Sequence, residues 1–524
     1  MNSRVPGRGR IRWNRWLGPP TALMALLAIA APASAQNVDP NELGSMSRSL
    51  EAIGAGAMWS SGYTGQGVDV AVIDTGVTPV NGLRTPGKVV YGPDLSWESQ
   101  APDARHLDSY GHGTHLAGII AGREDGVPAA TQPGEQRFTG VAPGSRLISL
   151  KAADSNGATD VSQVIAAIDW VVDHRDRYGM KIRVLNLSYG TDGVQPSEID
   201  PLSHAVENAW RKGITVVVSA GNGGFGDGRL NNPAINPHVI AVGAASPSGT
   251  YGTSDDVVQP WSEHGVGREP DVVAPGKSII SLRDPGSTVD ETYPDGRYGE
   301  LFFRGSGTSQ AAAFVSGAAA LIISQRPTIK PNQVKALLER TASPLPDADT
   351  SAQGAGMIDL KVARTAPTPE NLTQTPSRST GVGSLDAARG SMHLVADGVT
   401  LDGERDIFGA PFSSTRWATA STGTYTWDHE EWMDRDWSGE QFSTTAWNGG
   451  SYQRWDSIPW TRSSWRGDVW SGEFWQRSSW RDDSWTRSSW RDDGWSRSSW
   501  RSNDLWSSAA WGSTRSGSPT ETAP

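Results

Sequence analysis

Residues 67–76, Gly67-Val-Asp-Val-Ala-Val-Ile-Asp-Thr-Gly76, contain a compact apolar, β-branched run that stops at Asp74. Such a run, bounded by glycine, is typical of a strand buried on both faces of a parallel sheet. Similar runs occupy residues 146–150, 182–187, 214–218 and 239–243. We therefore expect a mainly parallel sheet, with Asp74 at the carboxyl end of one of its strands.

Stretches with helical periodicity lie between these runs. One apolar stripe at helical spacing consists of Val164, Ile165, Ile168, Val171 and Val172. Alternation of strands and helices predicts an α/β fold, a doubly wound parallel sheet with helices on both faces. In such folds the functional groups lie at the carboxyl ends of the strands, which is where Asp74 falls.

Three segments far apart in the chain supply an acid, a base and a nucleophile. They are centred on Asp74, on His112 in Tyr110-Gly-His-Gly-Thr-His115, and on Ser309 in Gly307-Thr-Ser-Gln-Ala-Ala312. A serine hydroxyl becomes an effective nucleophile when a base takes its proton, and a carboxylate fixes the tautomer of that base. The order Asp, His, Ser is one of the known orders of a serine-hydrolase triad.

Such a triad also needs donors for the negative oxygen of the tetrahedral intermediate. Ser309 opens a predicted helix, whose positive amino end and backbone amide favour that charge. Residues 216–222 predict a buried strand ending in Gly221 and Asn222. We expect the Asn222 carboxamide to be the second donor.

With these residues in place, the chain resembles the subtilisin-like serine proteases, the subtilase family. Six matching segments occur in family order between about Met58 and Val362, at residues 74–76, 112–115, 187–190, 219–222, 274–276 and 307–309. The resemblance implies a secreted serine endopeptidase that works through an acyl-enzyme. It implies Asp74 as orienter, His112 as general base and then acid, Ser309 as nucleophile, and Asn222 with the Ser309 amide as oxyanion hole.

The resemblance also implies which segments bind a protein or peptide substrate. An extended peptide would pair with edge segments, a form of β-augmentation. The expected substrate-binding residues are Ser188, Tyr189, Gly190, Asn156, Gly157, Ala158, Ser219, Ala220 and Gly221. No cofactor is required for the chemistry. Structural calcium is common in the family, but the sequence offers no Asp-rich loop from which to name ligands.

His112 and His115 stand three residues apart and could in principle form a metal pair. No acidic partner lies within the motif, so we expect no metal site there. His115 is better explained as a packed residue behind the triad.

The amino terminus has the features of a secretory signal peptide. A cationic start, with arginines at 4, 8, 10, 12 and 15, precedes the apolar stretch Thr21 to Ala30 and the small residues Ala33-Ser-Ala35. The alternative is an uncleaved membrane anchor, but the apolar stretch is shorter than the roughly 20 residues that a span needs. We expect cleavage after Ala35 and a secreted or cell-surface protein.

Composition limits the functions and the kinds of site that the chain could have. Asp plus Glu number 57 and Lys plus Arg 46, giving a net charge of −11, which argues against nucleic-acid binding. The absence of cysteine excludes disulfides and cysteine metal sites. The expected organisation is a signal peptide at 1–35, a short segment at 36–57, a peptidase domain at 58–365, a linker with a small Gly/Asp-rich β unit at 366–412, and a Trp-rich repeat tail at 413–524.

The tail carries a tryptophan at every fifth position from 455 to 500, and Arg-Ser-Ser-Trp recurs at 462–465, 477–480, 487–490 and 497–500. Fixed-period repetition indicates a repeated unit or a low-complexity array. Arginine beside tryptophan suits cation–π stacking. Two interpretations remain: a module that contacts a cell surface or polysaccharide, and a disordered spacer. A second functional class therefore remains too, a surface-adhesion or scaffold protein with a weakly active protease-like domain.

Overall fold

In a computed structural model of the chain, the described residues are 39, 42–100, 104–124, 126, 138–226, 228–247, 251–370, 372, 376–396, 399–429 and 431–436. The chain divides into units of residues 1–35 and 36–524, and every described residue belongs to the second. The predicted signal peptide and the tryptophan array at 455–500 lie outside the described residues.

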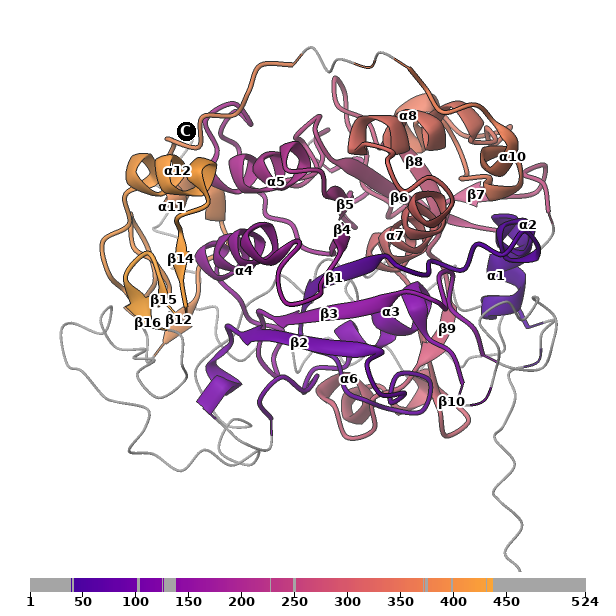
Figure 1. The fold of residues 1–524 in the computed structure, drawn as a ribbon, viewed down its shortest axis with the longest axis horizontal. Helices are drawn as coiled ribbons and strands as arrows, with labels where there is room; N and C mark the ends of the chain where they lie inside the picture. Colours follow the sequence, from indigo (N-terminus) through magenta and orange to yellow (C-terminus); the bar gives the residue numbers. More distant parts are fainter. Residues whose placement is uncertain are drawn as a thin grey trace, which may run out of the picture. The chain divides into compact units, whose positions relative to one another are not determined.

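The main sheet has the strand order β2-β3-β1-β4-β5-β6-β7, with β8 also pairing with β6 (Figure 1). All its pairs are parallel except that of β6 with β7. The bounds are β1 Asp69–Asp74, β2 Val89–Asp94, β3 Arg146–Lys151, β4 Ile182–Leu187, β5 Thr215–Ser219, β6 Ile240–Ser246, β7 Val257–Val258 and β8 Val272–Pro275. The predicted parallel α/β sheet is confirmed, since five predicted strands match β1, β3, β4, β5 and β6 to within a few residues.

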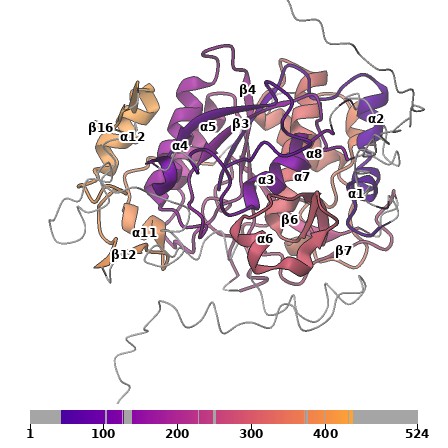
Figure 2. The same cartoon turned by 90° about the horizontal axis from the view of Figure 1, so that it is seen from below.

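Helices cover both faces of this sheet (Figure 2). On one side lie α4 (Val161–His174) and α5 (Pro201–Arg211), and on the other lie α3 (His112–Ala121) and α7 (Thr308–Gln325). The start of α4 is fixed by Asp160, whose side chain accepts from Ser162 N while the Gln163 side chain accepts from Asp160 N. This capping box satisfies amides that have no partner within the helix.

Smaller elements surround this core. The remaining helices are α1 Met46–Ala52, α2 Ala55–Ser60, α6 Thr288–Thr292, α8 Pro331–Thr341, α9 Thr350–Gln353, α10 Leu360–Thr365, α11 Leu385–Arg389 and α12 Ser414–Gly423, with short 3₁₀ helices η1 Trp97–Gln100 and η2 Pro294–Gly296. The remaining strands are β9 Ile279–Leu282, β10 Arg297–Tyr298, β11 Phe302–Gly305, β12 Val395–Ala396, β13 Val399–Thr400, β14 Trp427–Asp428, β15 Glu431–Trp432 and β16 Arg435–Asp436. Among the described residues, no helix is both long and apolar enough to cross a membrane.

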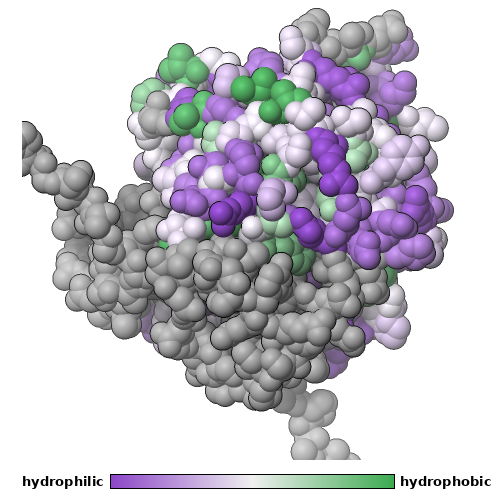
Figure 3. All heavy atoms as spheres, turned by 90° about the vertical axis from the view of Figure 1, so that its left-hand side faces the viewer, coloured by the Kyte–Doolittle hydropathy of each residue, from purple (hydrophilic) through white to green (hydrophobic). Residues whose placement is uncertain are grey.

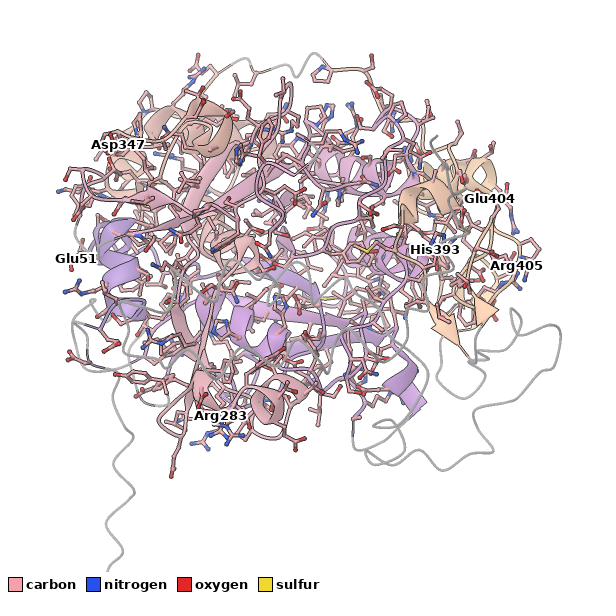
Figure 4. All side chains as sticks on the ribbon, turned by 180° about the vertical axis from the view of Figure 1, so that it is seen from behind. Glu51, Arg283, Asp347, His393, Glu404 and Arg405 are labelled. Atoms are coloured by element: carbon pink, nitrogen blue, oxygen red, sulfur yellow. The ribbon has the colours of Figure 1, made fainter. Side chains whose placement is uncertain are left out.

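Residues 376–436 form a C-terminal extension that packs on α4 and α5 (Figures 1 and 2). Where the sequence predicted a small β unit at 381–412, the described residues contain helix α11, the antiparallel pair of two-residue strands β12 and β13, and a bridge between Arg405 and Pro411. Helix α12 and strands β14–β16 follow, so residues 414–436 at the start of the predicted tail are packed structure. The side chains of Glu404 and Arg405 lie at the outer side of the extension (Figure 4).

Two buried carboxylates, Asp169 of α4 and the N-cap residue Asp160, hold the extension in place. Asp169 accepts hydrogen bonds from the indoles of Trp417 (2.8 Å) and Trp432 (2.9 Å) and from the Ser421 hydroxyl (2.9 Å). Asp160 forms an ion pair with Arg389, whose side chain is fully buried (Nε–Oδ1 2.6 Å).

On the surface that faces the viewer in Figure 3, hydrophilic and hydrophobic residues are interspersed over the described part.

Candidate active site

Asp74 is the last residue of β1, and its side chain is 1 % exposed. Its Oδ1 accepts the Thr75 amide at 2.8 Å and lies 2.7 Å from His112 Nδ1. Burial raises the pKa of Asp74, while the charge and hydrogen bond of His112 oppose that shift. A carboxylate at Nδ1 fixes one tautomer of the imidazole and leaves Nε2 as the proton-accepting nitrogen.

His112 is the first residue of α3 and is fully buried. The approach of α3 to β1 depends on Gly113, because a Cβ at that position would lie 2.1 Å from the Gly76 carbonyl oxygen. Any side chain at residue 113 would therefore push the His112 ring away from Asp74. The Gly113 amide donates instead to Thr75 Oγ1 at 3.0 Å.

Asp108 anchors the amino end of α3. Its Oδ1 accepts the Gly111 amide (2.7 Å) and the Thr75 hydroxyl (2.7 Å), and its Oδ2 accepts the Thr114 amide (2.7 Å). These bonds satisfy helix-terminal amides and link the helix to the residue after Asp74. Sequence reasoning missed Asp108 and Thr75. The signal available was an aspartate four residues before the helix start, as at helix caps.

Ser309 is the second residue of α7 and is fully buried. Its backbone amide is among the first four of the helix, which make no intrahelical bond and carry the positive end of the helix dipole. Its carbonyl accepts from Ser188 Oγ at 3.4 Å. This bond ties the start of α7 to the residue that follows β4.

Asn222 is held by the residue that precedes Ser309. The Thr308 amide donates to Asn222 Oδ1 at 2.9 Å, and the Thr308 hydroxyl lies 3.1 Å from the same oxygen. An amide donor requires an oxygen acceptor, so this contact fixes which end of the carboxamide is oxygen. The Nδ2 donor is directed away from Thr308 as a result.

Register and hydrogen bonds bring these residues to one edge of the sheet. The parallel pair β1–β4 ends with Ile73 opposite Leu187, so Asp74 and Ser188 are the next residues on neighbouring strands. Asp74 bonds to His112, and Ser188 bonds to Ser309. The predicted acid, base and nucleophile therefore gather at the carboxyl ends of β1 and β4.

The predicted substrate segments follow three strands of the same sheet. Residues 156–158 follow β3, residues 188–190 follow β4, and residues 219–221 lie at the end of β5. Asp154 shapes the first segment, since its Oδ1 accepts the amides of Asn156 and Ala158. The Tyr189 side chain is 1 % exposed, and burial raises the pKa of its phenol well above its ordinary value. Only the backbone of Tyr189 is therefore suited to pair with a peptide.

His115 points to backbone rather than to a metal position. Its Nε2 lies 3.2 Å from the Ile279 carbonyl and 3.1 Å from the Phe303 carbonyl, so this nitrogen carries a proton. Burial lowers the pKa of His115 to about 3. Within the described ranges, no group of three or more His, Asp or Glu residues could hold a metal ion.

Comparison with known proteins is consistent with this geometry. Residues 65–383 match the family model described as the Subtilase family. Serine protease AprX of Bacillus subtilis is 36% identical over 305 residues, covering 57% of this chain and 66% of that protein. Subtilisin DY of Bacillus licheniformis is 34% identical over 314 residues, covering 59% of this chain and 96% of that protein.

Among solved structures, the chain is similar to fervidolysin from Fervidobacterium pennivorans, a keratinolytic enzyme related to subtilisin. The two share 29% identity with a TM-score of 0.49, over 62% of this chain and 46% of the other.

Proposed function

Since the chain belongs to the subtilase family of serine endopeptidases, we propose that it cleaves peptide bonds with Asp74, His112 and Ser309 as its triad. The observation that carries the assignment is the 2.7 Å contact of His112 Nδ1 with a buried Asp74, at the sheet edge where Ser309 opens α7. Family membership does not favour the alternative of a scaffold protein. The chemistry of the family uses no cofactor.

In the proposed reaction, His112 Nε2 takes the proton of Ser309 Oγ as that oxygen attacks the substrate carbonyl carbon. Asn222 Nδ2 and the Ser309 amide donate to the resulting oxyanion, while Asp74 stabilises the imidazolium. His112 then gives the proton to the leaving amine, which breaks the C–N bond and leaves an acyl ester on Ser309. Water, deprotonated by His112, hydrolyses the ester and restores the serine.

Covalent labelling with a fluorophosphonate tests the nucleophile directly. We expect rapid labelling of the wild-type chain and none of Ser309→Ala, because the probe needs an activated serine. Ser324→Ala is a matched control at the other end of α7, where the hydroxyl bonds the Gln66 carbonyl. Equal labelling of Ser309→Ala and wild type, or no labelling of either, would refute the assignment.

We further propose that the protein is exported, with residues 1–35 removed, residues 36–57 preceding the peptidase domain at 58–365, and residues 366–412 and 413–524 following it. The arginine-rich start and the Ala33-Ser-Ala35 site support export. Edman sequencing of the mature protein should begin at Gln36.

The regular tryptophans of the tail, flanked by arginine, support contact with a cell surface or polysaccharide. Co-sedimentation with cell-wall material of the full chain, but not of a chain ending at residue 436, would support this role. Equal sedimentation of both would exclude it.

A further inference from the structure

The segments that follow β4 and β5 separate beyond the sheet. The strands pair as far as Leu187 and Val218. Past that point Ala220 N continues the β5–β6 ladder by donating to Val242 O (3.0 Å), and Thr191 N donates to Asn232 O (2.8 Å). Residues 188–191 and residues 219–221 are therefore two segments, each held by a bond to a third part of the chain.

Residues 231–232 bridge these two segments. Asn231 N donates to Ala220 O at 3.2 Å, and Asn232 N donates to Thr191 O at 2.9 Å. A glycine of each segment faces the bridge. A Cβ at Gly190 would lie 2.8 Å from Asn231 Cβ, and one at Gly221 would lie 2.4 Å from Asn231 Nδ2. The Asn231 side chain thus lies against both glycines, between the two segments.

Glu263 brings a carboxylate to the same glycine, Gly221. Its backbone amide donates to the Gly221 carbonyl at 2.9 Å. Its Oε2 lies only 1.7 Å from the position that a Gly221 Cβ would take, so the carboxylate rests directly against the Gly221 backbone. The residue is 8 % exposed.

Both segments are tied to the first turn of α7. Ser188 Oγ donates to the Ser309 carbonyl (3.4 Å), and the Gly221 amide donates to Thr308 Oγ1 (3.2 Å). A peptide paired along residues 188–190, with its reactive carbonyl near Asn222 and the Ser309 amide, would direct the side chain of the carbonyl-bearing residue toward Gly221 and Glu263. This step rests on the proposed function.

We propose that Glu263 determines cleavage specificity and that the enzyme cleaves after arginine or lysine. A buried carboxylate suits a cationic side chain, because a charge-assisted hydrogen bond gains strength where water is excluded. An acidic side chain would be repelled there. A large apolar side chain would desolvate the carboxylate without replacing its hydrogen bonds.

The test compares peptides that differ only in the residue before the scissile bond: Arg, Lys, Gln, Leu, Phe or Glu. We expect kcat/KM to be highest for Arg and Lys. In Glu263→Gln, which keeps the shape and removes the charge, the Arg-to-Leu ratio of kcat/KM should fall by about tenfold or more. Glu269→Gln, at an exposed position six residues away, should leave the ratio unchanged. Benzamidine, a small arylamidine cation, should inhibit the wild type competitively and Glu263→Gln much less.

Fluorophosphonate labelling separates the two levels of the proposal. Failure to label Ser309 would overturn the proposed function and this specificity with it. Labelled enzyme that prefers Leu or Phe would overturn the specificity alone, as would a Glu263→Gln variant that keeps the Arg preference. The wild-type peptide profile decides the matter even if Glu263→Gln does not fold.

Discussion

At the candidate active site, residues that are distant in sequence hold the functional side chains in position. Asp74, His112, Ser309 and Asn222 could be identified from sequence because each stands in a short motif. Thr308 could not, because its role comes from a contact with Asn222, 86 positions away. Asp108 offered only a helix-cap signal, and its bond to Thr75, 33 positions away, needed the structure. The pairing of Glu263 with Gly221 likewise becomes visible only once the segment between β7 and β8 folds back on the end of β5.

Asn222→Ala tests the oxyanion role at the residue scale. The variant loses the Nδ2 donor, whereas the Thr308 amide loses only an acceptor. We expect kcat to fall about 10²–10³-fold with little change in KM, a magnitude known from subtilisin itself and carried over to this relative. Steady-state kinetics measure it, with the thermal midpoint confirming that the variant is folded. Wild-type kcat in a folded variant would contradict the role of Asn222.

At the scale of elements, the sequence reveals a helix or strand that nearby residues determine better than one that depends on contacts with distant residues. Five strands of the main sheet were predictable because they are short apolar runs bounded by glycine or proline, and α4 was predictable because its apolar stripe is regular. The extension was not, because α11 and α12 are short and polar. Their partners Asp160 and Asp169 lie more than 220 residues earlier in the chain.

Arg389→Met tests the ion pair between α11 and α4. Both side chains are fully buried, so the variant leaves the Asp160 charge without its main partner. We expect the free energy of unfolding to fall by about 3–5 kcal/mol. Urea denaturation measures the change.

Arg416→Met in α12 is the matched control, because its partner Asp434 is exposed and such pairs contribute at most about 1 kcal/mol. Equal effects of the two arginine variants would show that the buried ion pair contributes no more to the free energy of unfolding than the exposed pair.

At the scale of the whole molecule, the protonation of Asp169, which binds the C-terminal extension, affects the free energy of unfolding. Burial raises the pKa of Asp169 to about 6 from 3.8, although hydrogen bonds from Trp432, Trp417 and Ser421 oppose the shift. The folded state therefore holds this proton more tightly than the unfolded state. The contribution of this proton to the free energy of unfolding is fully present below about pH 4 and is lost as pH rises through about 6.

Asp169→Asn removes this titration. Its unfolding free energy minus that of wild type should therefore rise by about 3 kcal/mol between pH 3 and pH 8, mostly between pH 4 and 6. Denaturation curves at several pH values measure the difference. Asp434→Asn, at an exposed position, should show no such slope. A pH-independent difference for Asp169→Asn would contradict the raised pKa.

The Asp169–Trp432 bond spans 263 residues, and this span has a consequence for synthesis. A ribosome that has added Asp169 must add all of those residues before Trp432 can reach its acceptor. At about 5–20 residues per second that interval is roughly 13–53 s. The nascent chain thus carries an α4 surface that Trp432 does not yet cover throughout that interval.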